Sequence, residues 1–205
     1  MSTTTATPWL ERWLPLLRER AGNSPLLELG CGAGADTVPL TTAELRVIGI
    51  DRSASEIAQA RIAAPTAEFY VQDMRANFPP TATQLGAVLA SLSLHYFSWR
   101  ETVILIERIR AVLNIGGILL CRVNSTNDHN YGASGHPPIE QNYYSVDGEP
   151  KRFFDADMLG KLFDNGWHML AMEEMIIDKY PKPKSVWELV VEKVNVEKAP
   201  ANRRI

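Results

Sequence analysis

Short apolar runs alternate with amphipathic stretches along most of the chain. We predict buried strands at the apolar runs 25–30, 46–51, 67–73, 84–94 and 116–125. Between these runs, the spacing of apolar residues predicts helices over 36–45, 53–64 and 99–113. Apolar strands that alternate with helices are typical of a parallel sheet covered by helices on both faces.

This alternation ends after a further predicted helix in 155–167. Two strands then follow each other directly, at 167–177 and 185–194, with a Pro-rich turn between them. Strands joined in this way pair as an antiparallel hairpin. The expected fold is therefore α/β, a doubly wound Rossmann-like sheet of seven strands, mostly parallel with a C-terminal antiparallel hairpin and with helices on both faces.

Three segments are expected to lie outside this alternation. Residues 1–24 should form a tail and a helix, which Thr7 caps and Pro15 kinks. Trp9 and Trp13 share one face of this helix, as packing residues or alternatively as substrate contacts. The polar, turn-rich segment 124–150 is long for a loop in a compact domain, so we expect it to border or cover a binding site. We predict one domain over 25–194, followed by a solvated tail at 195–205.

The composition narrows the class of protein. Hydrophobic residues make up 45% of the 205 residues, enough for one sizeable core, and the formal net charge of −3 offers no basic surface for nucleic acid. Cys31 and Cys121 lie within apolar runs, so we expect reduced, buried thiols. No apolar run reaches the ~18 residues of a membrane span, and the N-terminus lacks the pattern of a secretory signal. We therefore expect a cytoplasmic protein without nucleic-acid or membrane partners.

The stretch "LLELGCGAGAD", residues 26–36, is the strongest candidate for chemistry. Glycines let a strand turn sharply into a helix and let a ligand approach the backbone. Asp51, at the end of the next predicted strand, is placed to accept hydrogen bonds from both ribose hydroxyls of an adenosine. Gly30, Gly32 and Ala35 also satisfy a dinucleotide fingerprint, so this loop alone leaves a nicotinamide cofactor open.

Four further features distinguish the two ligands. They are "VQDMR" around Asp73, "AVLASLSLHYF" at 87–97, "RAVLNIGGILLCRV" at 110–123, and the final hairpin. Together with the glycine loop, they resemble in order and spacing the class I S-adenosylmethionine-dependent methyltransferases, from about residue 25 to the end. The part after the fifth strand is also similar, in a general way, to the tellurite-resistance group of these enzymes.

The resemblance implies a site for S-adenosylmethionine as the cofactor. In it, Asp51 holds the ribose, Asp73 meets the adenine amino group, and the Met74 amide meets a ring nitrogen. Glu28 is expected either to reach the donor's amino group or to be solvated at the strand end. The cofactor-binding residues that we predict are Glu28, Gly30, Cys31, Gly32, Gly34, Asp51, Arg52, Asp73, Met74, Ser91 and Leu92.

On the acceptor side, His95 follows the fourth strand, where the family pattern places the donor methyl. It is the candidate catalytic base, or alternatively a residue that only shapes the pocket wall. The candidate substrate contacts are His95, Tyr96, Tyr131, His136 and Tyr143. We expect no metal site, because the spacing of His129 and His136 matches no common ligand pattern. The expected partner is a small-molecule acceptor, and the oligomeric state stays open between monomer and homodimer.

Two alternatives remain beside the methyltransferase. One is a nicotinamide-dependent Rossmann-fold reductase, although the hairpin leaves no second βαβ half, and the Tyr180–Lys184 match to a reductase motif lies in a turn. The other is an adenosine-binding module of the same fold without turnover.

Overall fold

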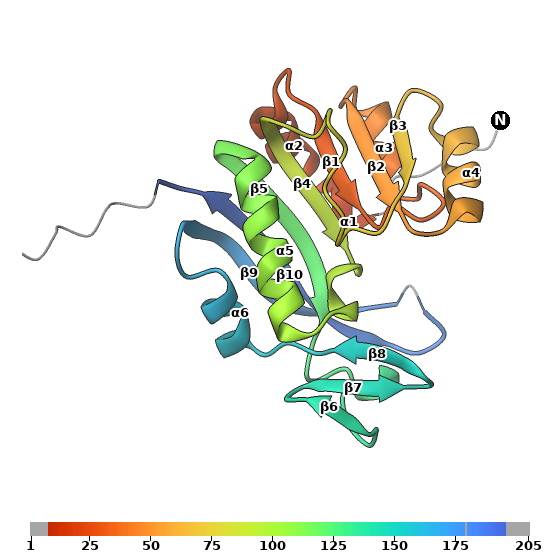
Figure 1. The fold of residues 1–205 in the computed structure, drawn as a ribbon, viewed down its shortest axis with the longest axis vertical. Helices are drawn as coiled ribbons and strands as arrows, with labels where there is room; N and C mark the ends of the chain where they lie inside the picture. Colours follow the sequence, from red (N-terminus) through yellow and green to blue (C-terminus); the bar gives the residue numbers. More distant parts are fainter. Residues whose placement is uncertain (1–7, 179, 196–205) are drawn as a thin grey trace, which may run out of the picture.

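A computed structural model describes residues 8–178 and 180–195 of the chain. Its main element is a seven-stranded sheet with the order β3-β2-β1-β4-β5-β10-β9 (Figure 1). The strands are β1 (Leu26–Leu29), β2 (Val47–Asp51), β3 (Glu68–Val71), β4 (Leu85–Ser91), β5 (Leu113–Asn124), β9 (Trp167–Ile177) and β10 (Lys184–Lys193). The predictions for Thr7 and for the tail beyond residue 195 lie outside the described residues.

The direction of the strands confirms the predicted architecture. The first five strands pair in parallel, from β3 through β2, β1 and β4 to β5. Strand β10 enters between β5 and β9 and is antiparallel to both. The carboxyl ends of β1, β2 and β4 therefore open at one edge of the sheet, which is where open α/β sheets bind ligands.

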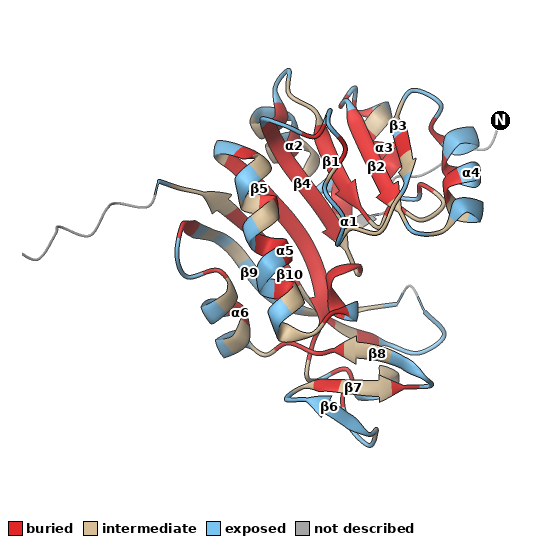
Figure 2. Ribbon diagram, in the orientation of Figure 1, coloured by how far each residue is buried: buried red, intermediate tan, exposed pale blue. Residues whose placement is uncertain are grey.

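Helices cover both faces of the sheet. They are α1 (Pro8–Glu11), α2 (Leu14–Ala21), α3 (Thr37–Thr42), α4 (Ala54–Ala63), α5 (Trp99–Val112) and α6 (Ala156–Leu162). One core joins α5 and α6 to one face of the sheet, and a second joins α1, α2 and α3 to the other face. The parallel strands β1, β2, β4 and β5 are mostly buried on both faces, which explains their nearly continuous apolar sequences (Figure 2).

Several helix boundaries follow from local sequence. Ser53 caps α4 by accepting a hydrogen bond from the Glu56 amide, and Ser98 and Glu101 form a reciprocal capping box at the start of α5. Pro15 lies in the first turn of α2, and the expected interruption separates α1 from α2.

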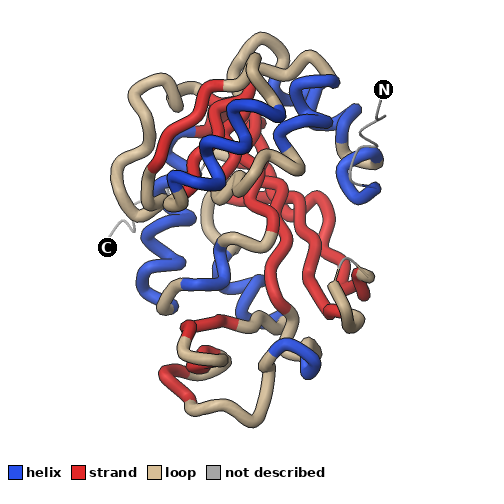
Figure 3. Tube along the Cα trace, turned by 90° about the vertical axis from the view of Figure 1, so that its right-hand side faces the viewer, coloured by secondary structure: helices blue, strands red, loops and turns tan. Residues whose placement is uncertain are grey.

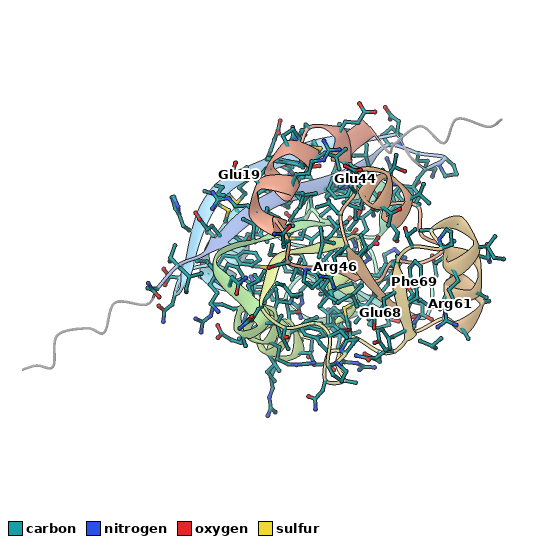
Figure 4. The ribbon with its side chains drawn as sticks, turned by 90° about the horizontal axis from the view of Figure 1, so that it is seen from above. Glu19, Glu44, Arg46, Arg61, Glu68 and Phe69 are labelled. Atoms are coloured by element: carbon teal, nitrogen blue, oxygen red, sulfur yellow. The ribbon has the colours of Figure 1, made fainter. Side chains whose placement is uncertain are left out.

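Helix α4 contacts the β3 edge of the sheet. Arg61 on α4 donates a hydrogen bond from its Nη2 to the Phe69 carbonyl at 2.9 Å, and Figure 4 shows these two residues close together. Phe69 itself packs with Cys31, Ile57 and Ala60 in a small core beneath the helix. Helix α4, which follows β2 in the chain, is thereby held against β3.

The segment 124–150 differs from the expected loop. It contains a short 3₁₀ helix, η2 (His129–Tyr131), and most of a second, three-stranded antiparallel sheet made of β6 (Pro138–Glu140), β7 (Tyr143–Val146) and β8 (Glu149–Arg152). This small sheet lies apart from the main sheet at one end of the molecule (Figure 3). The turn between β7 and β8 is Asp147-Gly148, with φ angles of 54° and 84°. Asp-Gly is a strong hairpin signal, so the β7–β8 hairpin could have been predicted from the sequence.

Two smaller predictions concern the cysteines and membrane-spanning helices. Cys31 and Cys121 are both buried and free, as predicted. Within residues 8–178 and 180–195, no helix combines the length and the apolar character that crossing a membrane requires.

Candidate functional site

A cavity of about 380 Å³ opens at the carboxyl ends of β1, β2 and β4. Polar residues from the strand ends form one side of it, and residues of β8 form part of the other. The lining residues are Gly30, Asp51, Arg52, Gln72, Asp73, Met74, Arg75, Leu92, Ser93, Tyr96, Phe97, Glu149 and Pro150. The volume and the mixed lining are within the range of small-molecule sites.

The glycine turn after β1 is held against the end of β2. The amides of Gly30 and Cys31 both donate to the Ile50 carbonyl, at 2.8 and 3.1 Å. Gly30 has a φ of +72°, and a Cβ added there would lie 2.6 Å from the Cβ of Ser93. Only glycine lets the turn pass this close to the end of β4. At Gly34 an added Cβ would instead meet Ala60 of α4, so this glycine serves helix packing and does not line the cavity.

Asp51 lies at the end of β2 and lines the cavity. One carboxylate oxygen accepts a hydrogen bond from the Gly32 amide at 3.0 Å, and the other accepts from the Ser53 amide at 2.8 Å. These bonds orient the carboxylate and tie the glycine turn to the start of α4. Each oxygen has further lone-pair capacity for a ligand hydroxyl.

Asp73 follows β3 and forms an ion pair with Arg75. The distance between Asp73 Oδ2 and Arg75 Nη2 is 2.7 Å. Hydrogen bonds from Arg75 lower the pKa of Asp73, so this carboxylate is ionised at neutral pH. Arg75 also lines the cavity and pairs with Glu101 at 3.3 Å, a role that the sequence analysis missed.

The end of β4 has an unusual backbone. Leu92, directly after the strand, has a φ of +55°, a conformation that costs a residue with a side chain on the order of 1 kcal/mol or more. The next residue, Ser93, donates a hydrogen bond from its hydroxyl to the Leu29 carbonyl at 2.6 Å. Both residues line the cavity, so the strained turn directs the chain along its wall.

Glu28 lies beneath the glycine turn and does not line the cavity. Its carboxyl group is buried and accepts a hydrogen bond from the Thr37 hydroxyl at 2.5 Å. The pKa of Glu28 is raised to about 8, mainly by burial. Asp36 and Asp51 also raise this pKa, and the hydrogen bond from Thr37 lowers it. Of its two expected roles, solvation at the strand end is wrong, because the side chain is enclosed by protein.

His95 lies in a 3₁₀ turn, η1 (Leu94–Tyr96), and only 4% of it is exposed. Its Nδ1 is buried and has no hydrogen-bond partner in the described part of the chain. Burial, with smaller contributions from Lys184 and Lys151, lowers its pKa to about 3. The ring is therefore neutral at neutral pH but has little affinity for a proton. The cavity wall at this turn is formed by the neighbouring Tyr96 and Phe97.

The small sheet is fastened to the η1 turn by two side chains. Arg152, 1% exposed, donates from Nε to the Phe97 carbonyl at 3.0 Å and forms an ion pair with Glu140. The Tyr143 hydroxyl donates to the Tyr96 carbonyl at 3.0 Å. These contacts place Glu149 and Pro150 of β8 in the cavity wall. The predicted position of this segment beside a site therefore agrees with the cavity, although its predicted loop structure does not.

The other expected acceptor contacts lie elsewhere. Tyr131 accepts and donates hydrogen bonds at Lys182 in the β9–β10 turn, and its ring faces Lys184, which forms a buried ion pair with Asp128 at 2.6 Å. His136 is half-buried near Gly132, and Tyr143 contacts the site only through its bond to Tyr96. Of the predicted substrate contacts, the structure brings only Tyr96 to the cavity wall.

The predicted cofactor residues divide into two groups. Gly30, Asp51, Arg52, Asp73, Met74 and Leu92 line the cavity. Glu28, Cys31, Gly32, Gly34 and Ser91 lie behind it or beside it, and their role toward a cofactor stays a prediction. The lining residues that sequence reasoning missed are Gln72, Arg75, Ser93, Phe97, Glu149 and Pro150. Four of these six adjoin a predicted residue in the sequence, so position next to a strand end was the available signal.

Comparison with known proteins agrees with this geometry. Residues 26–117 match a family model described as a methyltransferase domain. An uncharacterised methyltransferase of Synechocystis sp. is 32% identical over 111 residues, which cover 53% of this chain and 52% of that protein. Trans-aconitate 2-methyltransferase of Paracidovorax citrulli is 37% identical over 98 residues, 47% of this chain and 37% of that protein. The chain thus matches about half or less of the length of these relatives.

A solved structure extends the likeness over the rest of the fold. The S-adenosylmethionine-dependent methyltransferase of Methanosarcina mazei superposes with a TM-score of 0.70 at 20% identity, over 83% of this chain and 92% of that one. Residues 26–117 therefore resemble a methyltransferase domain, and the chain has the fold of the S-adenosylmethionine-dependent methyltransferases.

Proposed function

We propose that this protein is an S-adenosylmethionine-dependent methyltransferase that methylates a small molecule. The observation that carries the proposal is the cavity in which the glycine turn, Asp51 and Asp73 converge at the ends of β1, β2 and β3. Glycine at position 30 also lets the turn pass close to Ser93 in the cavity wall, where a Cβ would clash. The match of residues 26–117 to a methyltransferase domain supports the same reading.

The residues of this chain would act mainly by binding and orientation. Asp51 would accept hydrogen bonds from the ribose, and Asp73 would accept one from the adenine amino group. When bound, S-adenosylmethionine supplies a methyl group on a sulfonium, and the thioether that leaves is neutral, so no acid is needed to assist it. Positioning the acceptor in line with the methyl carbon can supply roughly 7–11 kcal/mol of the barrier reduction.

A general base has little support in this site. His95 is the nearest candidate by sequence, yet it is buried and its pKa is lowered to about 3. A base is required only when the acceptor arrives protonated. We therefore assign His95 a role in shaping the wall behind Tyr96, the second of its two expected roles, and we propose an acceptor that is already deprotonated at neutral pH.

The size of the cavity and its cover favour a small acceptor. The volume of about 380 Å³ is at the lower end for ligand sites, and the small sheet closes one side of it. The formal net charge of −3 gives no electrostatic attraction for nucleic acid.

Calorimetry with S-adenosylmethionine, S-adenosylhomocysteine and NADPH tests the proposal. We expect binding of the first two and none of the third, and the reverse would establish the nicotinamide alternative. Asp51→Ala should weaken donor binding at least tenfold, since two ribose hydrogen bonds of about 1 kcal/mol or more are lost. Asp164→Ala, at an exposed position in the turn after α6, is the matched control. A donor affinity within threefold of wild type for Asp51→Ala would refute this role of Asp51.

Turnover separates an enzyme from a binding module. Formation of S-adenosylhomocysteine over a broad panel of small acceptors is the expected result. Donor binding without any product across the panel would favour the module without catalysis.

A further inference from the structure

A row of polar side chains crosses the sheet on the face that α1 covers. In register across the strands, Ser91 of β4 lies beside Arg122 of β5, and Arg122 lies beside Glu188 of β10. The two residues that precede Arg122 along this face of β5, Leu120 and Ile118, belong to the core under α1 and α2. A charged row in an otherwise apolar face needs a physical reason, because burying a charge is costly.

Arg122 is the residue in this row that lacks a partner. Only 3% of it is exposed, and its Nε is buried without a hydrogen bond. Within residues 8–178 and 180–195, its guanidinium forms no hydrogen bond and no ion pair with another side chain. Glu188 and Asp36 act on it only at longer range, and burial lowers its pKa. A buried guanidinium has five donors, and leaving them unused costs free energy.

The neighbouring acids are engaged by other residues. Glu188, 1% exposed, pairs with Arg12 at 2.6 Å and accepts a hydrogen bond from the Trp13 indole at 2.6 Å. Asp36 accepts a hydrogen bond from the Trp9 indole at 3.1 Å. These contacts hold α1 over the row while leaving the guanidinium of Arg122 free for another anion.

The Trp9 ring lies against this guanidinium. The Arg122 Cζ lies 4.5 Å from the centroid of the Trp9 ring, so the indole covers a face of the planar group. The N–H donors of a guanidinium lie in its plane, in a fork that matches the two oxygens of a carboxylate. An arginine held against an aromatic ring, whose Nε–H has no acceptor in the described residues, suits a carboxylate once the ligand reaches it.

Arg122 also lies next to the cavity. Its carbonyl accepts a hydrogen bond from the Leu92 amide at 2.8 Å, and Leu92 and Ser93 line the cavity. The end of β4, where the fold family holds the reactive methyl, is therefore one residue from the strand position of Arg122.

We propose that Arg122, with Trp9 stacked on it, is a subsite that binds a carboxylate of the methyl acceptor. This inference rests on the proposed methyltransferase function. A carboxylic acid is ionised at neutral pH, which agrees with a site whose buried His95 has little affinity for a proton. Small mono-, di- and tricarboxylic acids are the chemical class that fits, and α1 must shift locally to admit them.

The first experiment measures binding of small carboxylates to the full chain saturated with S-adenosylhomocysteine. The probes are succinate, citrate and benzoate, each compared with its uncharged amide by calorimetry. We expect at least one acid to bind with at least tenfold higher affinity than its amide. The inference is overturned if no carboxylate binds at millimolar concentration to a protein that does bind S-adenosylhomocysteine. Failure to bind S-adenosylhomocysteine would instead refute the proposed function.

Variants then test the residue. Arg122→Gln should weaken carboxylate binding at least tenfold, and Arg122→Lys should restore only part of it, because a lysine keeps the charge without the fork. The matched control is Arg18→Gln, on the same side of the sheet, where Nε of Arg18 donates to the Ala43 carbonyl. Unchanged carboxylate affinity in Arg122→Gln would contradict the proposal.

Two further measurements exclude other roles of Arg122. If it were structural, Arg122→Met would lower the Tm, whereas an unpaired charge replaced by an apolar side chain should leave the Tm within about 3 °C of wild type or raise it. If it held the methionine carboxylate of the donor, Arg122→Gln would weaken S-adenosylhomocysteine tenfold or more without affecting 5′-methylthioadenosine, which lacks that group. Either of these results would overturn the acceptor assignment, and we expect neither.

Discussion

The two sides of the cavity are built in different ways. The donor side consists of strand ends that are held mainly through the backbone. The amides of Gly30 and Cys31 donate to the Ile50 carbonyl, and the Gly32 amide donates to the Asp51 carboxylate. The acceptor side is a small separate sheet that is fastened by side chains, chiefly Arg152 and Tyr143, to the η1 turn. On this side a few buried polar contacts carry the attachment.

This difference predicts different responses to substitution. A framework held mainly by backbone hydrogen bonds tolerates little added volume. An attachment through side chains can be weakened one bond at a time while the main sheet stays intact. Substitutions on the donor side should therefore affect donor affinity, and those on the acceptor side should affect the acceptor KM.

Gly30→Ala should have the largest effect. The new Cβ would lie 2.6 Å from the Cβ of Ser93, at a φ of +72° that disfavours alanine. Overpacking and backbone strain together should cost about 3 kcal/mol, or roughly 100-fold in donor affinity. Calorimetry with S-adenosylhomocysteine measures it. The matched control is Gly135→Ala, which has a φ of +80° and no atom within 4 Å of the new Cβ, so it carries the strain alone. Equal donor affinities in the two variants would contradict the close approach.

Arg152→Leu tests the attachment of the small sheet. It leaves the carbonyls of Phe97 and Gln141 and the Glu140 carboxylate without their partner, which should lower the free energy of unfolding by about 3 kcal/mol. We expect a raised acceptor KM with donor affinity unchanged. Arg110→Leu removes a surface pair with Glu107 and should change stability by no more than about 0.5 kcal/mol. A parallel loss of donor affinity in Arg152→Leu would show that the two sides are not independent.

The pH dependence of stability should carry a contribution from Glu28 on the donor side. Its pKa is raised to about 8 from 4.5, so the folded protein keeps a proton that the unfolded chain releases. This contribution to stability is complete below pH 4.5 and is lost as the pH rises to 8, at about 1.4 kcal/mol per pH unit for this group. In urea unfolding between pH 5 and 8, the free energy of unfolding of Glu28→Gln should rise relative to that of wild type as the pH increases. A constant difference would refute the raised pKa.

His95, on the acceptor side, should have the opposite sign. Its pKa is lowered to about 3 from 6.5, so below pH 6.5 the unfolded chain binds a proton that the folded protein does not. Its contribution is complete above pH 6.5 and is lost as the pH falls toward 3. Thermal unfolding of His95→Gln should therefore depend less on pH than that of wild type between pH 6 and 4. Identical slopes would mean that His95 titrates normally.

Tyr143→Phe should have the smallest effect. It removes one hydrogen bond to the Tyr96 carbonyl, worth about 1 kcal/mol, and should raise the acceptor KM roughly fivefold. Tyr144→Phe is the matched control, because the neighbouring ring packs against Phe153 through its carbon atoms. Steady-state kinetics with a saturating donor distinguish them. Equal acceptor KM values for the two variants would place the Tyr143 hydroxyl outside the attachment.

Much of the donor side was predictable because strand ends of a parallel sheet meet at one edge. Asp51 and Asp73 follow apolar runs directly, so their common location at the cavity follows from topology alone. Arg75 and Ser93 were missed although they directly follow the predicted residues Met74 and Leu92, because which side chain faces the cavity depends on the turn after each strand. The left-handed backbone at Leu92 could not be predicted from the sequence, because this position is not a glycine.

The sequence by itself determined the seven-stranded α/β architecture, the antiparallel hairpin and the position of the glycine turn. These depend on the periodicity of apolar residues and on local turn chemistry, which are visible in a few neighbouring residues. Only the tertiary structure decided that Glu28 and His95 are enclosed, that Arg152 holds the small sheet, and that the buried Arg122 Nε has no hydrogen-bond partner in the described part of the chain. Such properties arise from segments 27 to more than 100 residues apart in the chain, as between Trp9 and Asp36 or Trp13 and Glu188, and no local pattern encodes them.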